Sequence, residues 1–251
     1  MEYEGRTLRR IVRVSDSLIG GWIEGERNLS QKGSCFVYDN AKVYGEAEIY
    51  DEAKVYGNAK VLGEAKVYGN AKVLGGAEVY GKACICSFAK VFDNAQVYGD
   101  ANALGGAQVY GDAQVYDNAE VFGQAKVYGN AKVYDKAKVY GEAEVYGEAA
   151  VYWRARVHEH AKVYEHAQVY EEAEVFGEAK VYGEACICHL AKISGLAKVY
   201  GEAEVFHLAR VYDEAKVYGE AKVYDKAQVY GLAKVYEGGQ AYGEAEVYGC
   251  A

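Results

Sequence analysis

Five histidines carry most of this chain's capacity for chemistry, because an imidazole can accept and donate protons near neutral pH. His189 and His207 are eighteen residues apart, and each is followed by Leu and Ala. None of the five belongs to a catalytic motif that we can match, so the sequence assigns no catalytic residue. The candidates for a general base are His160, His189 and His207; the other two histidines are His158 and His166.

Cysteines supply the second group of reactive side chains. Two Cys-Ile-Cys segments, at 84–86 and 186–188, place pairs of thiols on the outer side of one strand. Neighbours two apart on a strand are poorly placed for a disulfide, and we expect a reducing compartment, the cytoplasm. Cysteine with histidine is a ligand set that suits soft metals. A flat outer face is hard to close around an ion, so no metal or cofactor is assigned, and the candidate ligands are Cys186, Cys188, His189 and His207.

A six-residue repeat must position these side chains. Counting from Ala41 in steps of six reaches alanine thirty-five times in thirty-six, and the exception is Gly239. With positions numbered from the alanine, position three is valine in thirty of thirty-six units, position four is tyrosine in twenty-five, and position five is most often glycine. Repetition at a fixed period indicates an architecture in which each unit contacts only its neighbours.

The repeat predicts short strands with one buried face. Positions one and three are apolar, whereas position two is usually Lys, Glu, Gln or Arg, which is an alternation of period two. We expect four strand residues and then a two-residue corner, where glycine supplies backbone freedom. A helix is excluded because a repeat of six does not match its turn, and each of the 30 glycines would cost about 1 kcal/mol there.

A two-residue corner cannot connect parallel strands that lie side by side, so a hairpin meander is excluded. The remaining arrangement is a triangular coil in which three units of six residues form the three sides. The sequence therefore predicts an all-β protein, a single-stranded triangular parallel β-helix solenoid of about 12 coils of 18 residues. Residues 43–48, Val-Tyr-Gly-Glu-Ala-Glu, resemble the motif of the hexapeptide-repeat, left-handed β-helix family. Tyr44 departs from that motif, which has a small or acidic residue there. The resemblance implies left-handed coiling.

Residues 1–34 break the repeat, and we expect them to form an N-terminal cap on a solenoid of residues 35–251. A solenoid must cover its first open edge. The stretch from Leu8 through Gly-Gly-Trp-Ile-Glu to Ala41 resembles uncharacterised hexapeptide-repeat proteins of bacteria and phages that are labelled acyltransferases. Such enzymes generally use a histidine base in a cleft between the subunits of a trimer. The label implies little by itself, because a fold does not imply a function.

Side chains at position four should form ladders along the coils, and stacked rings attract one another. An exposed aromatic face can also dock a partner. One ladder contains Tyr110, Tyr128, Tyr146, Tyr164, Tyr182, Tyr200, Tyr218 and Tyr236.

Two further surfaces predict self-association. Apolar side chains replace the usual Gly, Tyr and charged residues in one region, and such patches mark contacts. The last repeat, which includes Tyr248 and Ala251, predicts an open strand edge that pairs end to end with another copy. The lateral patch consists of His189, Leu190, Leu196, Phe206, His207 and Leu208.

Composition narrows the class of protein. The formal net charge of −9 favours solubility and argues against a nucleic-acid partner. We expect that the acidic start is no signal peptide, and no stretch has the apolar length of a membrane span.

Catalytic sites need departures from a repeat, and this chain offers few. We therefore expect a non-enzymatic structural or interaction protein, a rigid tyrosine-clad solenoid that self-associates or docks a partner. The alternative is an acyltransferase-like enzyme that acts at a trimer interface.

Overall fold

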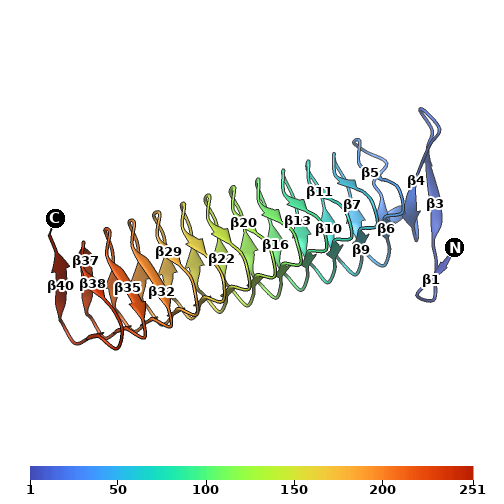
Figure 1. Ribbon diagram of the computed structural model, residues 1–251. Coiled ribbons are helices and arrows are strands. Elements are labelled where there is room, and N and C mark those ends of the chain that lie inside the picture. Colours follow the sequence, from blue (N-terminus) through green and yellow to red (C-terminus); the bar gives the residue numbers. More distant parts are fainter. Residues whose placement is uncertain (251) are drawn as a thin grey trace. The chain divides into compact units, whose positions relative to one another are not determined.

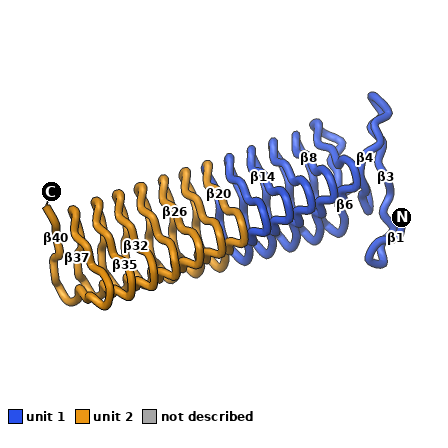
Figure 2. Tube along the Cα trace, in the orientation of Figure 1, with its two compact units in different colours: residues 1–123 blue, residues 124–251 orange. Residues whose placement is uncertain are grey.

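A computed structural model describes residues 1–250, and its chain divides into two compact units, Met1–Gly123 and Gln124–Ala251 (Figure 2). In each unit the chain winds through short strands that stack as successive coils (Figure 1). None of the described residues forms a helix that is long and apolar enough to cross a membrane.

Unit 1 begins with two antiparallel pairs, β1 (Glu2–Tyr3) with β2 (Arg6–Thr7) and β3 (Arg9–Arg13) with β4 (Leu18–Ile23). The short 3₁₀ helix η1 (Glu26–Asn28) follows. Strand β4 pairs in parallel with β6 (Lys42–Val43), so the N-terminal segment extends one face of the coils. Whether residues 1–34 act as a separate cap stays a prediction.

The coils of unit 1 build three parallel faces. Face 1 contains β4, β6, β9 (Lys60–Val61), β12 (Glu78–Val79), β15 (Gln96–Val97) and β18 (Gln114–Val115). Face 2 contains β5 (Phe36–Val37), β8 (Lys54–Val55), β11 (Lys72–Val73), β14 (Lys90–Val91) and β17 (Gln108–Val109). Face 3 contains β7 (Glu48–Ile49), β10 (Lys66–Val67), β13 (Cys84–Ile85), β16 (Asn102–Ala103) and β19 (Glu120–Val121).

Unit 2 is built in the same way. Its face 1 contains β21 (Lys132–Val133), β24 (Ala150–Val151), β27 (Gln168–Val169), β30 (Cys186–Ile187), β33 (Glu204–Val205), β36 (Lys222–Val223) and β39 (Gln240–Ala241). Face 2 contains β20 (Lys126–Val127), β23 (Glu144–Val145), β26 (Lys162–Val163), β29 (Lys180–Val181), β32 (Lys198–Gly201), β35 (Lys216–Gly219) and β38 (Lys234–Val235). Face 3 contains β22 (Lys138–Val139), β25 (Arg156–Val157), β28 (Glu174–Val175), β31 (Lys192–Ile193), β34 (Arg210–Val211), β37 (Gln228–Gly231) and β40 (Glu246–Gly249).

Each coil contains eighteen residues, as the sequence predicts. The strand register places Cys186 beside Gln168 on one side and Glu204 on the other, and the same spacing recurs throughout both units. The predicted parallel solenoid is therefore confirmed, and its left-handed coiling stays a prediction.

Most strands span two residues, so the prediction of four strand residues is wrong for most coils. The N–H groups of positions two and four donate to the next coil, for example from Lys192 to Ala209 (3.0 Å) and from Ser194 to Val211 (2.9 Å). The N–H of position one instead donates across the corner to the carbonyl of position four, as from Ala197 to Ser194 (3.3 Å). In many coils position four therefore keeps its N–H in the ladder, while its carbonyl accepts the turn bond.

The core consists of the side chains at positions one and three. From Ala41 to Val229 all of them are 0 % exposed, including the isoleucines that replace valine. Position five forms the corner with a left-handed backbone, such as φ +74° at Gly183. A Cβ there would lie 2.7 Å from the backbone nitrogen of Gly201 in the next coil, which explains the preference for glycine.

The predicted tyrosine ladder is confirmed within unit 2. Ring centroids from Tyr128 to Tyr218 follow one another at 4.8 to 5.0 Å, and the last pair, Tyr218 and Tyr236, lies at 5.4 Å. Tyr110 belongs to unit 1, where its ring stacks on Phe92 at 4.7 Å. Ladders of the same kind occur on the other faces.

Among the described residues, Asn28 is the one polar residue that is buried, with 0 % exposure. Its side-chain nitrogen donates to the carbonyls of Gly45 (3.0 Å) and Ala47 (2.9 Å), and its side-chain oxygen accepts from the Gly25 N–H (3.0 Å). The nitrogen and the oxygen of this amide are thus both bonded to backbone groups. These bonds hold residues 25–28 against the coil that contains Gly45 and Ala47.

Candidate functional site

The candidate site lies in unit 2, where three coils meet at one corner. Strands β27, β30 and β33 are consecutive on face 1, and the corner residues that follow them are 170–171, 188–189 and 206–207. The eighteen-residue coil brings these corners together. The predicted residues Cys186, Cys188, His189, Phe206 and His207 therefore lie in two adjacent coils.

Acidic residues at position five normally stabilise the next corner. The carboxylates of Glu159 and Glu165 accept the backbone N–H of the residue eighteen positions later at 2.8 Å, and those of Asp213 and Asp225 do so at 3.1 and 3.2 Å. A carboxylate bonded in this way satisfies an N–H that points out of the corner. The sequence analysis did not identify this role, although the eighteen-residue spacing could have predicted it.

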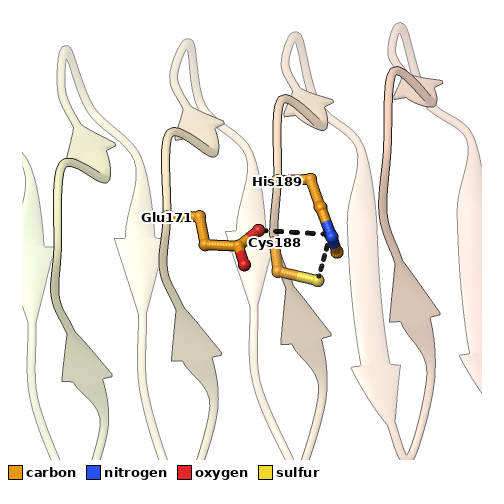
Figure 3. Close-up of side chains that lie close together, drawn as sticks. All are labelled: Glu171, Cys188 and His189. Atoms are coloured by element: carbon orange, nitrogen blue, oxygen red, sulfur yellow. Dashed lines mark hydrogen bonds and ion pairs between the residues drawn. The ribbon is translucent and has the colours of Figure 1, made fainter.

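Glu171 occupies such a corner and departs from the pattern. Its Oε2 atom is buried and has no hydrogen-bond partner among the described residues. It instead lies 3.2 Å from Nδ1 of His189, within ion-pair distance although the N–H geometry does not make a hydrogen bond. Nδ1 of His189 also lies 3.2 Å from Sγ of Cys188 (Figure 3). The three ligand atoms are all within 4.8 Å of one another, so this corner gathers one oxygen, one nitrogen and one sulfur.

The two thiols of this segment are chemically different. Cys186 Sγ lies 3.3 Å from the hydroxyl of Tyr170. The neighbouring Cys188 thiol, and to a smaller extent Tyr170, lower the pKa of Cys186 to about 7, although burial opposes this shift. Cys186 raises the pKa of Cys188, and burial adds to the effect. All six cysteines are free, as the sequence predicts.

The other Cys-Ile-Cys segment is a natural comparison. Cys84 Sγ lies 3.5 Å from the Tyr68 hydroxyl, which repeats the thiol–phenol contact. The residue after Cys86 is Ser87, where the second segment has His189, and the corner eighteen residues before it is glycine instead of Glu171. Burial raises the pKa of Cys84, in contrast to the lowered pKa of Cys186. Only the second segment combines thiols with an imidazole and a carboxylate.

His207 does not complete the metal-ligand set that the sequence suggested. Its Nδ1 lies 3.2 Å from Asp225 Oδ1, and its ring meets that of His189 edge-on at 4.9 Å. Glu171, which the sequence analysis missed, takes the place expected for His207. The sequence shows that Glu171 is acidic and lies eighteen residues before His189, but it does not show the direction of the Glu171 side chain.

The remaining histidines also face carboxylates. His160 lies 3.5 Å from Glu142, and His166 lies 3.4 Å from Glu148, with all four side chains largely exposed. His158 is 3.2 Å from Glu174 Oε1 and stacks in a ladder on Tyr140 and Phe176. The acid partners lie sixteen or eighteen residues away, which is the spacing of neighbouring coils.

The predicted lateral patch is divided between two corners. Leu190 and Leu208 lie in adjacent coils at one corner, and each is about half exposed (48 % and 49 %). Leu196 is equally exposed but belongs to the following corner, because its N–H donates to the carbonyl of Asp213. These three leucines are close along the chain and were therefore predicted to form one patch, but one side of the coil separates Leu196 from Leu190 and Leu208.

A hollow interrupts the ladder on face 3. Ser194 takes the place of an aromatic residue between Phe176 and Tyr212, and these three residues line the hollow together with Lys192 and Arg210. Neighbouring rings of this ladder are 5.2 Å apart from His158 to Phe176 and 5.1 Å apart from Tyr212 to Tyr230. Rings two coils apart are thus separated by about 10 Å, which leaves room for one further ring.

The hollow is lined by two cations, Lys192 and Arg210, and by the carboxylate of Asp213. Lys192 pairs with Glu174 at 2.8 Å. Arg210 has an exposed side chain and forms no ion pair in the part of the chain that the structure describes. Leu190 and Leu208 line a second hollow beside the same two cations.

The strand edge and the final residues were also predicted as an interaction site. Tyr248 is 66 % exposed. Ala251 lies outside the described residues. In comparisons with known proteins, no protein-family model matches the chain and no curated protein matches it, so the site is interpreted from its own geometry.

Proposed function

We propose that this protein is a non-enzymatic interaction scaffold of the hexapeptide-repeat β-helix type, and that it binds a second copy of itself through face 3 of unit 2. The stacked coils and ring ladders give a rigid surface that needs little ordering on association. The observation that carries the proposal is the hollow at Ser194, a missing ring in an otherwise continuous stack.

The chemistry of the hollow selects an aromatic ring accompanied by negative charge. Phe176 and Tyr212 offer two parallel ring faces, between which a third ring would make the contacts that position four makes elsewhere. Arg210 and Lys192 would attract carboxylates next to that ring. The chain itself carries an exposed ring next to a carboxylate, as in Tyr242-Gly243-Glu244, where Tyr242 is 58 % exposed, and it has a net charge of −9. A second copy of this chain therefore fits the hollow in both shape and charge.

The experiment is the mass in solution by light scattering over a concentration series. We expect reversible association of the wild-type chain. The variant Ser194→Tyr fills the hollow with the residue that the ladder uses elsewhere, so it should fold normally and weaken association by at least about tenfold, as the loss of a central contact does. Arg210→Glu should weaken association in the same direction. Leu74→Tyr, which adds a ring at position four of unit 1, is the matched control and should change nothing.

Two results would overturn the proposal. The first is a monomer throughout the concentration range. The second is association that is unchanged in Ser194→Tyr, which is the behaviour expected of end-to-end pairing through the last coil around Tyr248. A compact trimer that binds acyl-CoA, and loses it on replacement of His160, His189 or His207 by alanine, would support the acyltransferase-like alternative instead.

A further inference from the structure

The corner formed by Glu171, Cys188 and His189 has an electrostatic defect that the rest of unit 2 avoids. A buried carboxylate oxygen without a hydrogen bond is unfavourable, whereas the carboxylates of Glu159, Glu165, Asp213 and Asp225 accept a backbone N–H. No lysine or arginine pairs with Glu171 within residues 1–250. Among the described residues, the one group near this oxygen that can carry a positive charge is the imidazole of His189, at 3.2 Å.

The distances match those around a tetrahedral metal ion. Zinc binds sulfur at about 2.3 Å and nitrogen or oxygen at about 2.0–2.1 Å, so ligand atoms on neighbouring vertices are separated by roughly 3.3–3.8 Å. Nδ1 of His189 is 3.2 Å from Cys188 Sγ and 3.2 Å from Glu171 Oε2. In Figure 3 the contacts of Glu171 and Cys188 both end at the ring nitrogen of His189, so the three donor atoms lie together at one corner.

Three protein donors leave the fourth position of a tetrahedral ion to a water molecule, as in zinc sites that have three protein ligands.

We propose that Glu171, Cys188 and His189 bind one Zn²⁺ ion, through one oxygen, one sulfur and one imidazole nitrogen. The ion satisfies the unbonded carboxylate oxygen of Glu171. It also links two successive coils, because Glu171 belongs to the coil before the other two ligands. The site is independent of the hollow at Ser194, which lies on face 3.

The Cys-Ile-Cys segment at residues 84–86 supplies matched substitutions. Ser87 has φ +60° where His189 has +59°, and Gly69 has φ +65° where Glu171 has +62°. The variants His189→Ser and Glu171→Gly therefore convert the site into a corner that the chain already builds elsewhere, without new backbone strain. Each removes one ligand and leaves both thiols in place.

The test is a titration of the full chain with Zn²⁺ in competition with a chromophoric chelator, under a phosphine reductant that keeps the thiols reduced. We expect one ion per chain. His189→Ser, Glu171→Gly and Cys188→Ser should each weaken binding by more than about tenfold, whereas Cys84→Ser should leave it unchanged. Substitution with Co²⁺ should give a sulfur-to-cobalt charge-transfer band in the wild-type chain that weakens in Cys188→Ser, and far-ultraviolet circular dichroism should be the same for all variants.

Three results would overturn the proposal: no binding by the reduced chain, two equivalent ions per chain, or equal loss in Cys84→Ser and Cys188→Ser. The last two would mean that a pair of thiols is sufficient and that the imidazole and carboxylate play no part. Unchanged affinity in both His189→Ser and Glu171→Gly would lead to the same conclusion.

Discussion

Replacing Tyr182 by alanine tests how strongly the ring ladder stabilises the solenoid. The ring of Tyr182 lies 4.9 Å from that of Tyr164 and 4.8 Å from that of Tyr200, with interplanar angles of 5° and 3°. Each stacked pair contributes about 0.5–1.5 kcal/mol beyond burial, so Tyr182→Ala should lower the free energy of unfolding by about 1–3 kcal/mol through stacking alone. For a chain of this size that corresponds to a fall in melting temperature of about 2–12 °C.

The assay is thermal unfolding by circular dichroism, with two controls. Tyr182→Phe keeps both ring contacts and should change the free energy of unfolding by less than about 0.5 kcal/mol. Tyr236→Ala removes a single contact, at 5.4 Å and 12°, and should cost about half as much as Tyr182→Ala. Equal melting temperatures for Tyr182→Ala and Tyr182→Phe would refute the reasoning, because the rings would then only cover the surface.

Three further predictions concern the corners and the phenols. Gly183→Ala should destabilise the chain by about 2 kcal/mol or more in thermal melts, because φ is +74° and the new Cβ would lie 2.7 Å from the Gly201 nitrogen. Gly238 has open space around it, so Gly238→Ala should have little effect. Equal effects of the two substitutions would contradict the steric argument. Glu165→Gln weakens the 2.8 Å bond to the Gly183 N–H by removing its charge, and should cost about 0.5–1.5 kcal/mol in urea unfolding; a neutral result would show that the corner acids are not needed. Burial, with smaller effects of neighbouring charges, raises the pKa of Tyr152 to about 12, above the value of about 10 in an unfolded chain. The stability linked to its neutral form is therefore complete below pH 10 and lost as the pH rises to 12, so phenolate absorbance and circular dichroism should change together in that range, and ionisation near pH 10 in the folded chain would contradict the shift.

The coil could be predicted because its determinants repeat. Alanine and valine at positions one and three leave only one way to form a continuous buried face, and the glycine corners set its period. The strand length was predicted less well, since it depends on backbone hydrogen bonds around the corners, which the residue types do not reveal.

The candidate site shows a different limit. The acidic partners of His160 and His189 are Glu142 and Glu171, and each lies eighteen residues before its histidine. These contacts could have been predicted by aligning the sequences of successive coils. The gap at Ser194 could have been found in the same way. The direction of the Glu171 side chain could not, because a carboxylate at this corner can satisfy either the backbone or a neighbouring side chain, and the choice depends on the local rotamer.

The buried amide of Asn28 has a consequence for how this chain folds. Coils that are near copies of one another pair almost equally well with the wrong neighbour, because a slip of eighteen residues still matches alanine with alanine and valine with valine. Contacts between neighbouring coils are close in sequence, so pairing can start at many points along the chain. Asn28 bonds to groups at Gly25, Gly45 and Ala47, and a slip of eighteen residues would offer it the equivalent carbonyls of Gly63 and Ala65. The amide therefore marks the start of the first coil without excluding a slip, so slipped and kinetically trapped molecules should form during refolding even when Asn28 is intact.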